Sequence, residues 1–123
     1  MQTYNLRPAW EASFCPSIAS SKSRRGHAAP GATRLEPGDG LAIDFGVVYE
    51  GYCSDMQRSW YFAKPGETGP PAELMRPFEA VRDGILLAAD LLKPGVRGYD
   101  VDRPVRQLVA DRGFTFTHAL GHQ

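Results

Sequence analysis

The hydrophobic pattern first becomes regular between residues 41 and 62, where apolar and polar positions alternate with a period of two. That period is typical of β-strands. In the first arm, 41–48, one face carries large apolar side chains and the other carries Asp44 between small neighbours. The second arm, 51–62, carries Asp55. The pattern therefore predicts a β-hairpin with one aspartate on each arm.

The turn of this hairpin decides how the two aspartates face each other. A two-residue turn at 49–50 places Asp44 directly opposite Asp55. Gly51 could instead form a bulge that shifts the register by one residue. Directly opposed carboxylates destabilise a hairpin unless a cation lies between them. Two interpretations stay open: a pair of solvated surface carboxylates, as aspartates near strands usually are, or a cation site.

Beyond the hairpin the apolar residues change to helical spacing. They predict one helix over 72–92, which Pro77 either kinks or starts, and a second over 101–111, capped by Asp100. Residues 114–117 are expected to begin another strand. The predicted core-facing positions are Leu74, Phe78, Val81, Ile85, Ala88, Ala89 and Leu92 in the first helix, and Val101, Val105, Leu108 and Val109 in the second.

The segment before the hairpin is less regular. Residues 13–20 are predicted to form an edge strand, because Pro16 has no N–H to donate to a neighbouring strand. A polar loop rich in glycine and proline follows and contains His27. Residues 1–12 show no periodicity and are interpreted as a lead-in.

Composition places the chain among ordinary globular proteins. Its 123 residues are 42% hydrophobic, which suffices for one domain or less. Fourteen basic and fourteen acidic residues cancel, so bulk charge attracts neither a nucleic acid nor an anionic membrane. Residues 1–30 contain no signal-peptide pattern, and no apolar run approaches a membrane span. Cys15 and Cys53 fit no metal or redox spacing, which favours reduced thiols and a cytoplasmic location.

The residues with candidate chemistry are the two aspartates and three histidines, namely Asp44, Asp55, His27, His118 and His122. Carboxylates combined with imidazoles suit a divalent ion such as Mn, Fe, Co or Zn. His118 and His122 share a face only if the strand that begins at 114 stays regular through Gly121.

Four segments then carry a resemblance: SFCPSIASSKSRRGHAAPG, LEPGDGLAIDFGVVYEGYCSDMQRSWYF, LLKPGV and HALGHQ. In this order they resemble the first half of the catalytic domain of the M24 metallopeptidases, which includes methionine aminopeptidase, aminopeptidase P, prolidase and creatinase. The resemblance covers most of residues 13–123. It implies an α+β pita-bread fold, a curved antiparallel sheet with helices packed on its outer face, incomplete in this chain.

The resemblance also implies roles for individual residues. Asp44 and Asp55 match ligands of a centre of two divalent metal ions (Mn, Co, Fe or Zn), with Asp55 bridging them. His122 matches the ligand histidine of the family's His-x-x-Gly/Ser-His pattern, and in a competing register His118 takes that place. His27 and His118 are then expected to act on the substrate. Two further glutamate ligands are expected beyond Gln123.

The implied activity is metal-dependent hydrolysis of an N-terminal peptide bond, at Xaa-Pro as in aminopeptidase P or prolidase. The expected partner is a peptide substrate. The chain alone is expected to be an inactive fragment that aggregates or forms a homodimer, because it lacks the glutamates and half of the sheet. Two alternatives stay open: a pita-bread domain that binds peptides or proteins without catalysis, and a creatinase-like C–N hydrolase.

Overall fold

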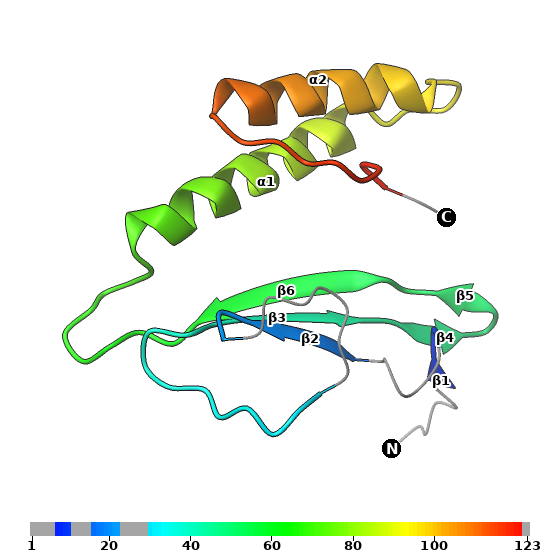
Figure 1. Cartoon of the computed structure of the whole chain (residues 1–123). Helices are drawn as coiled ribbons and strands as arrows, with labels where there is room; N and C mark the ends of the chain where they lie inside the picture. The colour runs from blue at the N-terminus through cyan, green and yellow to red at the C-terminus, as the bar shows by residue number, and fades with distance from the viewer. Residues whose placement is uncertain (1–6, 11–15, 23–29, 122–123) are drawn as a thin grey trace. The chain divides into compact units, whose positions relative to one another are not determined.

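A computed structural model describes residues 7–10, 16–22 and 30–121 (Figure 1). The chain divides into two compact units, Met1–Pro70 and Pro71–Gln123. The described part of the first unit is built from strands and that of the second from helices. Antiparallel sheets and two helices in one chain confirm the predicted α+β class.

The first unit contains two antiparallel sheets of three strands each (Figure 1). One has the order β1-β4-β5 and the other has the order β2-β3-β6. The predicted edge strand is confirmed as β2, which begins directly after Pro16. The strands are β1 (Arg7–Pro8), β2 (Ser17–Ser20), β3 (Gly40–Phe45), β4 (Val47–Tyr49), β5 (Tyr52–Cys53) and β6 (Met56–Tyr61).

The hairpin turns one residue later than predicted. Tyr49 pairs with Tyr52, so the two turn residues are Glu50 and Gly51. Both have positive φ, 49° for Glu50 and 86° for Gly51. Two central residues with positive φ form a turn whose twist matches that of the flanking strands, and glycine is favoured there. The predicted turn at 49–50 is therefore wrong, and the register of the whole hairpin moves with it.

Gly46 separates β3 from β4 at a point where the chain is crowded. A Cβ atom at Gly46 would overlap the backbone oxygen of Ser54 on the opposite arm. It would also lie 2.7 Å from Cζ3 of Trp10 and 2.9 Å from Cβ of Ala9. The arms stay paired beyond this point, because the Ser54 N–H donates to the carbonyl of Val47 at 2.9 Å. Only glycine fits this crossing.

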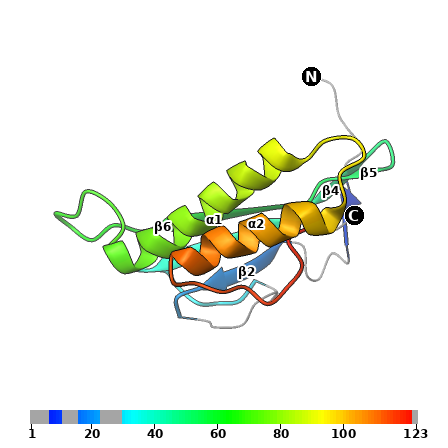
Figure 2. The ribbon, with the colours of Figure 1, turned by 90° about the horizontal axis from the view of Figure 1, so that it is seen from above.

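The second unit contains α1 (Ala72–Leu91) and α2 (Gly98–Asp111), which lie against each other (Figure 2). Pro77 lies within α1 and does not start it. The predicted cap at Asp100 is wrong, since α2 begins at Gly98 and the Asp100 carboxylate binds the Arg97 guanidinium at 2.7 and 3.0 Å. Within the described ranges, no helix is long and apolar enough to cross a membrane.

The contact between the two helices is made by small residues of α1 and valines of α2. Val101, Val105 and Val109 are buried, as predicted, and so are Ala80 and Gly84. A Cβ atom at Gly84 would lie 3.2 Å from Cγ1 of Val105, so the helices approach closely there. The larger apolar side chains predicted to face the core are exposed instead: Leu74, Phe78, Val81, Ile85 and Leu92.

Candidate metal centre

The residues singled out from the sequence are distributed over both units. Asp44 and Asp55 lie on the hairpin of the first unit, and His118 follows α2 in the second. His27 and His122 lie outside the described residues, as does Cys15. The hairpin is therefore where the described structure brings predicted ligands together.

Asp44 lies in β3, the central strand of its sheet, and is half-buried. It pairs with Ser17 of β2 on one side and with Gln57 of β6 on the other. The Gln57 Nε2 donates a hydrogen bond of 3.1 Å to Oδ2 of Asp44. Gln57 was not predicted as part of the site. The signal for it is its place two residues after Asp55, because residues two apart on a strand share a face.

Asp55 stands diagonally across from Asp44. Phe45 pairs with Met56 and Val48 with Cys53, so the same register places Asp55 opposite Gly46. The predicted direct opposition of the two aspartates is wrong, because the turn at Glu50-Gly51 shifts the register. Continued past Phe45–Met56, this register puts Asp55 on the same face as Gln57, the partner of Asp44, so both carboxylates lie on one face of the hairpin.

The donor chemistry of this pair fits a divalent ion as a partial ligand set. Carboxylate oxygens bind such ions at about 2.0–2.6 Å, and the exposed Asp55 is open to solvent on the hairpin surface. Across residues 7–10, 16–22 and 30–121, no three His, Cys, Asp or Glu side chains group closely enough to hold a metal. Among the described residues the two aspartates are therefore an incomplete ligand set for such an ion.

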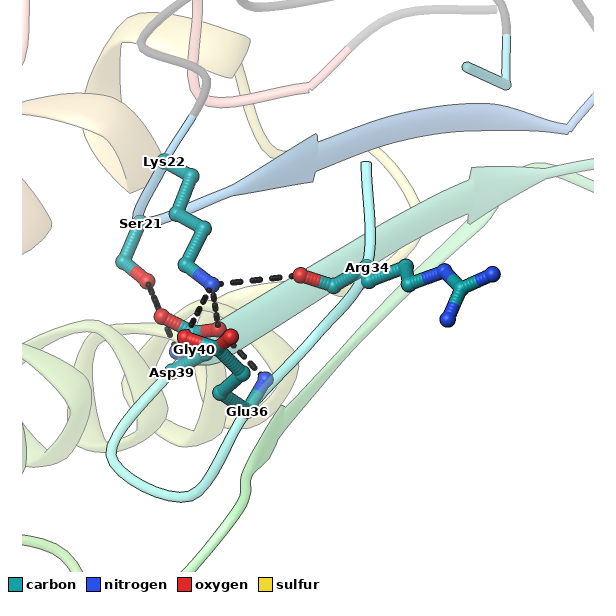
Figure 3. Close-up of polar contacts among 6 residues, drawn as sticks. All are labelled: Ser21, Lys22, Arg34, Glu36, Asp39 and Gly40. Atoms are coloured by element: carbon teal, nitrogen blue, oxygen red, sulfur yellow. Dashed lines mark hydrogen bonds and ion pairs between the residues drawn. The ribbon is translucent and has the colours of Figure 1, made fainter. Parts of the chain in front are cut away.

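A polar cluster joins the end of β2 to the turn before β3 (Figure 3). The buried Asp39 carboxylate accepts hydrogen bonds from the Ser21 hydroxyl at 3.1 Å and from the Glu36 N–H at 2.7 Å. The Lys22 ammonium lies 3.0 Å from Asp39 and 2.9 Å from Glu36. We call Ser21, Lys22, Glu36 and Asp39 the loop clamp, because the segment between Lys22 and Glu36 includes His27.

The contacts within the loop clamp shift the pKa values of Asp39 and Lys22. The Glu36 N–H, with smaller help from Lys22 and Ser21, holds the pKa of Asp39 below its ordinary value against the opposing effect of burial. The carboxylates of Glu36 and then Asp39 raise the pKa of Lys22. The sequence predicted only a turn at LEPGDG. The signal for the loop clamp is Asp39, an aspartate that stands directly before a strand.

His118 lies in the stretch that follows α2, and this stretch is not the strand predicted for 114–117. The His118 Nδ1 lies 2.7 Å from the carbonyl oxygen of Ala119. A carbonyl only accepts, so this contact calls for the hydrogen on Nδ1, and in the neutral tautomer that has it the lone pair is on Nε2. That nitrogen can bind a metal ion or accept a proton. The ring also lies 5.4 Å from that of Phe116, centroid to centroid.

A hollow of about 240 Å³ opens beside this histidine within the second unit. The side chains around it are mostly apolar and come from α1, α2 and the stretch after α2; they include Val81, Gly84, Val105, Val109, Phe116 and His118. The described part of the unit therefore offers an apolar surface with an imidazole at its edge.

Comparison with known proteins places these features in a family. The family model of metallopeptidase family M24 matches residues 2–123. An uncharacterized peptidase of Staphylococcus aureus (strain MRSA252) is 34% identical over 98 residues, which are 78% of this chain and 26% of that protein. The chain therefore spans about a quarter of the length of the curated relatives it matches.

Solved structures agree with the sequence matches. The prolidase from Pyrococcus horikoshii OT3 is 30% identical with a TM-score of 0.76, over 89% of this chain and 31% of that one. The X-Pro aminopeptidase from Thermotoga maritima MSB8 is 29% identical with a TM-score of 0.65, over 79% of this chain and 26% of that one. The strands and helices described above thus recur as part of larger pita-bread proteins.

Proposed function

Because the chain belongs to metallopeptidase family M24, we propose that residues 13–123 form the first half of the catalytic domain of an Xaa-Pro peptidase, with 1–12 as a lead-in. The observation that carries this proposal is the hairpin that holds Asp44 and Asp55 one diagonal step apart. Two carboxylates on one face of a hairpin repel each other, and this repulsion favours a bound cation. A metal ion between them reverses that effect.

We assign Asp44, Asp55 and His122 as ligands of two divalent ions, with His118 as the alternative histidine ligand. The family is generally one of dinuclear metal enzymes. When bound, such ions supply a hydroxide nucleophile at neutral pH and polarise the scissile carbonyl. The remaining ligands would come from residues beyond this chain.

In this proposal the chain's own residues orient the Asp44 carboxylate and transfer a proton at the substrate. Gln57 donates to Oδ2 of Asp44 and so fixes the direction of the carboxylate. His118 keeps Nε2 available because its Nδ1 donates to Ala119. This nitrogen can accept a proton from the attacking water and then pass that proton to the leaving amine. His27 is proposed as a second histidine at the substrate.

The names of the structural neighbours support the specificity for a peptide bond before proline. Those proteins are a prolidase and an X-Pro aminopeptidase at about 30% identity. We propose the same substrate class, a short peptide with proline in the second position, for the complete polypeptide that contains this chain.

Replacement of Asp55 by asparagine tests the metal assignment. Asp55→Asn keeps the shape of the side chain and removes one anionic ligand, so we expect the metal content of the complete polypeptide to fall by at least one ion per molecule. Elemental analysis after dialysis measures it. Asp90→Asn is the matched control, because Asp90 is an exposed aspartate of α1. An unchanged metal content in Asp55→Asn, equal to that of the control, would contradict the assignment.

A further inference from the structure

Arg106 of α2 ties the stretch that follows the helix back onto it. Its Nη1 donates to the carbonyl of Phe116 at 2.9 Å, and its Nη2 donates to the carbonyl of His118 at 2.7 Å. Its Nε binds the carboxylate of Asp102, one turn earlier on α2. The guanidinium carbon also lies 4.3 Å from the centre of the Phe116 ring. One side chain thus engages a carboxylate, two carbonyls and an aromatic face.

These contacts attach two backbone positions of the stretch to α2. The guanidinium presents N–H donors in a fixed, planar arrangement, and two of its nitrogens reach the carbonyls of Phe116 and His118. The Asp102 carboxylate binds Nε of Arg106 and so keeps the guanidinium from rotating away from these carbonyls.

We propose that Arg106 is a positioning residue for His118. The inference rests on the proposed function, in which His118 acts at the substrate or the metal. Arg106 fixes the backbone of His118 through its carbonyl oxygen, and the Ala119 carbonyl fixes the ring through Nδ1. Together the two contacts set the direction of Nε2. Arg106 itself touches no reacting atom in this scheme. Its effect reaches the chemistry only through the histidine.

Substitutions at Arg106 separate its geometry from its charge. Lysine keeps the charge but offers a single point donor, so Arg106→Lys can hold one carbonyl at most. Arg106→Met keeps much of the stem and holds neither. Arg103→Met is the matched control, because Arg103 lies on the same helix over the ring of Tyr99, at 5.6 Å. We expect Arg106→Met to loosen residues 116–119 most and Arg106→Lys to loosen them less. Arg103→Met should behave like wild type.

The first readout is independent of activity. Backbone order parameters from nuclear magnetic resonance on the complete polypeptide report how firmly residues 116–119 are held. We expect rigid values of about 0.85 in wild type and Arg103→Met, and values below about 0.6 in Arg106→Met. Unchanged order in Arg106→Met would overturn the clamp. If Arg106→Met does not fold, Arg106→Lys decides, with intermediate order supporting the clamp and wild-type order refuting it.

The second readout is kinetic and uses the complete polypeptide with an Xaa-Pro peptide and added Mn²⁺. A misplaced catalytic group can cost about 10²-fold in rate, so we expect kcat to fall up to that amount in Arg106→Met while KM changes little. In a His118→Ala background the same substitution should cost less than about 3-fold, because a residue that acts through another loses its effect with it. An equal loss in both backgrounds would overturn the proposal. A wild type that cleaves no Xaa-Pro peptide refutes the proposed function, and the order parameters still decide the clamp.

Discussion

The crossing at Gly46 gives the sharpest test of the hairpin geometry. Gly46→Ala adds one methyl group where the two arms touch, between the positions of Asp44 and Asp55. That methyl overlaps the Ser54 backbone oxygen and stands 2.7 Å from Trp10 and 2.9 Å from Ala9. Three contacts are therefore too short at once. Backbone atoms cannot rotate out of the way as a flexible side chain can, so the arms must separate.

The size of the effect follows from these distances. Overpacking costs about 1–3 kcal/mol in a well-packed site, and the backbone overlap at Ser54 puts this substitution near 3 kcal/mol. With a urea m-value of about 1–3 kcal/mol/M for a small protein, the unfolding midpoint should fall by about 1–3 M. Separation of the arms also moves Asp55 away from Asp44, so we expect Mn²⁺ affinity to fall with stability.

Tryptophan fluorescence in urea is the assay of choice. Both tryptophans, Trp10 and Trp60, belong to the first unit, so the signal reports the sheets and not the helices. Gly31→Ala is the matched control in the same unit, because a Cβ atom there has no atom within 4 Å. Its free energy of unfolding should stay within a few tenths of a kcal/mol of wild type. Equal midpoints for Gly46→Ala and Gly31→Ala would refute the close approach of the two arms.

Two further predictions concern the helix pair and the loop clamp. Val105→Ala removes buried methyl groups that face Gly84 and should destabilise the second unit by roughly 2 kcal/mol, measured by far-ultraviolet circular dichroism in urea. An unchanged helix midpoint would contradict the packing. The pKa of Asp39 is lowered on folding, so its stabilising effect is present above its ordinary pKa of 3.8 and is lost as the pH falls through the folded value. Asp39→Asn should therefore flatten the acid limb of the stability curve while it lowers stability at neutral pH, and an unchanged acid limb would refute this role.

Regular alternation of apolar residues predicted the strands of the hairpin, whereas the turn between them was predicted at the wrong residues. Alternation between 41 and 62 placed both arms of the hairpin correctly. The turn was missed because Glu50 adopts a positive φ, which is uncommon for a residue with a side chain. Gly51 carried the correct signal, as the second residue of a turn with positive φ, but a bulge was the one alternative considered for it.

The helices show the same limit. Apolar spacing located α1 and α2 to within a few residues, yet it assigned the contact face of α1 to its largest side chains. The contact is made by Ala80 and Gly84, because small residues let two backbones approach closely. Periodicity reports which residues are apolar, and it does not report how near a partner helix comes. The link from Arg106 to Phe116 and His118 could not be predicted either, since it binds their backbone oxygens, which every residue carries.

The loop clamp also bears on how this protein can change during evolution. It ties Lys22 to Glu36 and Asp39 next to the strands, so the ends of the intervening segment are held by the clamp and not by the segment's own length. Closure entropy grows slowly with loop length, and a doubling costs only about 0.6 kcal/mol. Insertions and deletions between Lys22 and Glu36 should therefore leave the hairpin and its aspartates in place. Relatives of this chain should therefore differ in length between the positions of Lys22 and Glu36 while they keep the hairpin that carries Asp44 and Asp55.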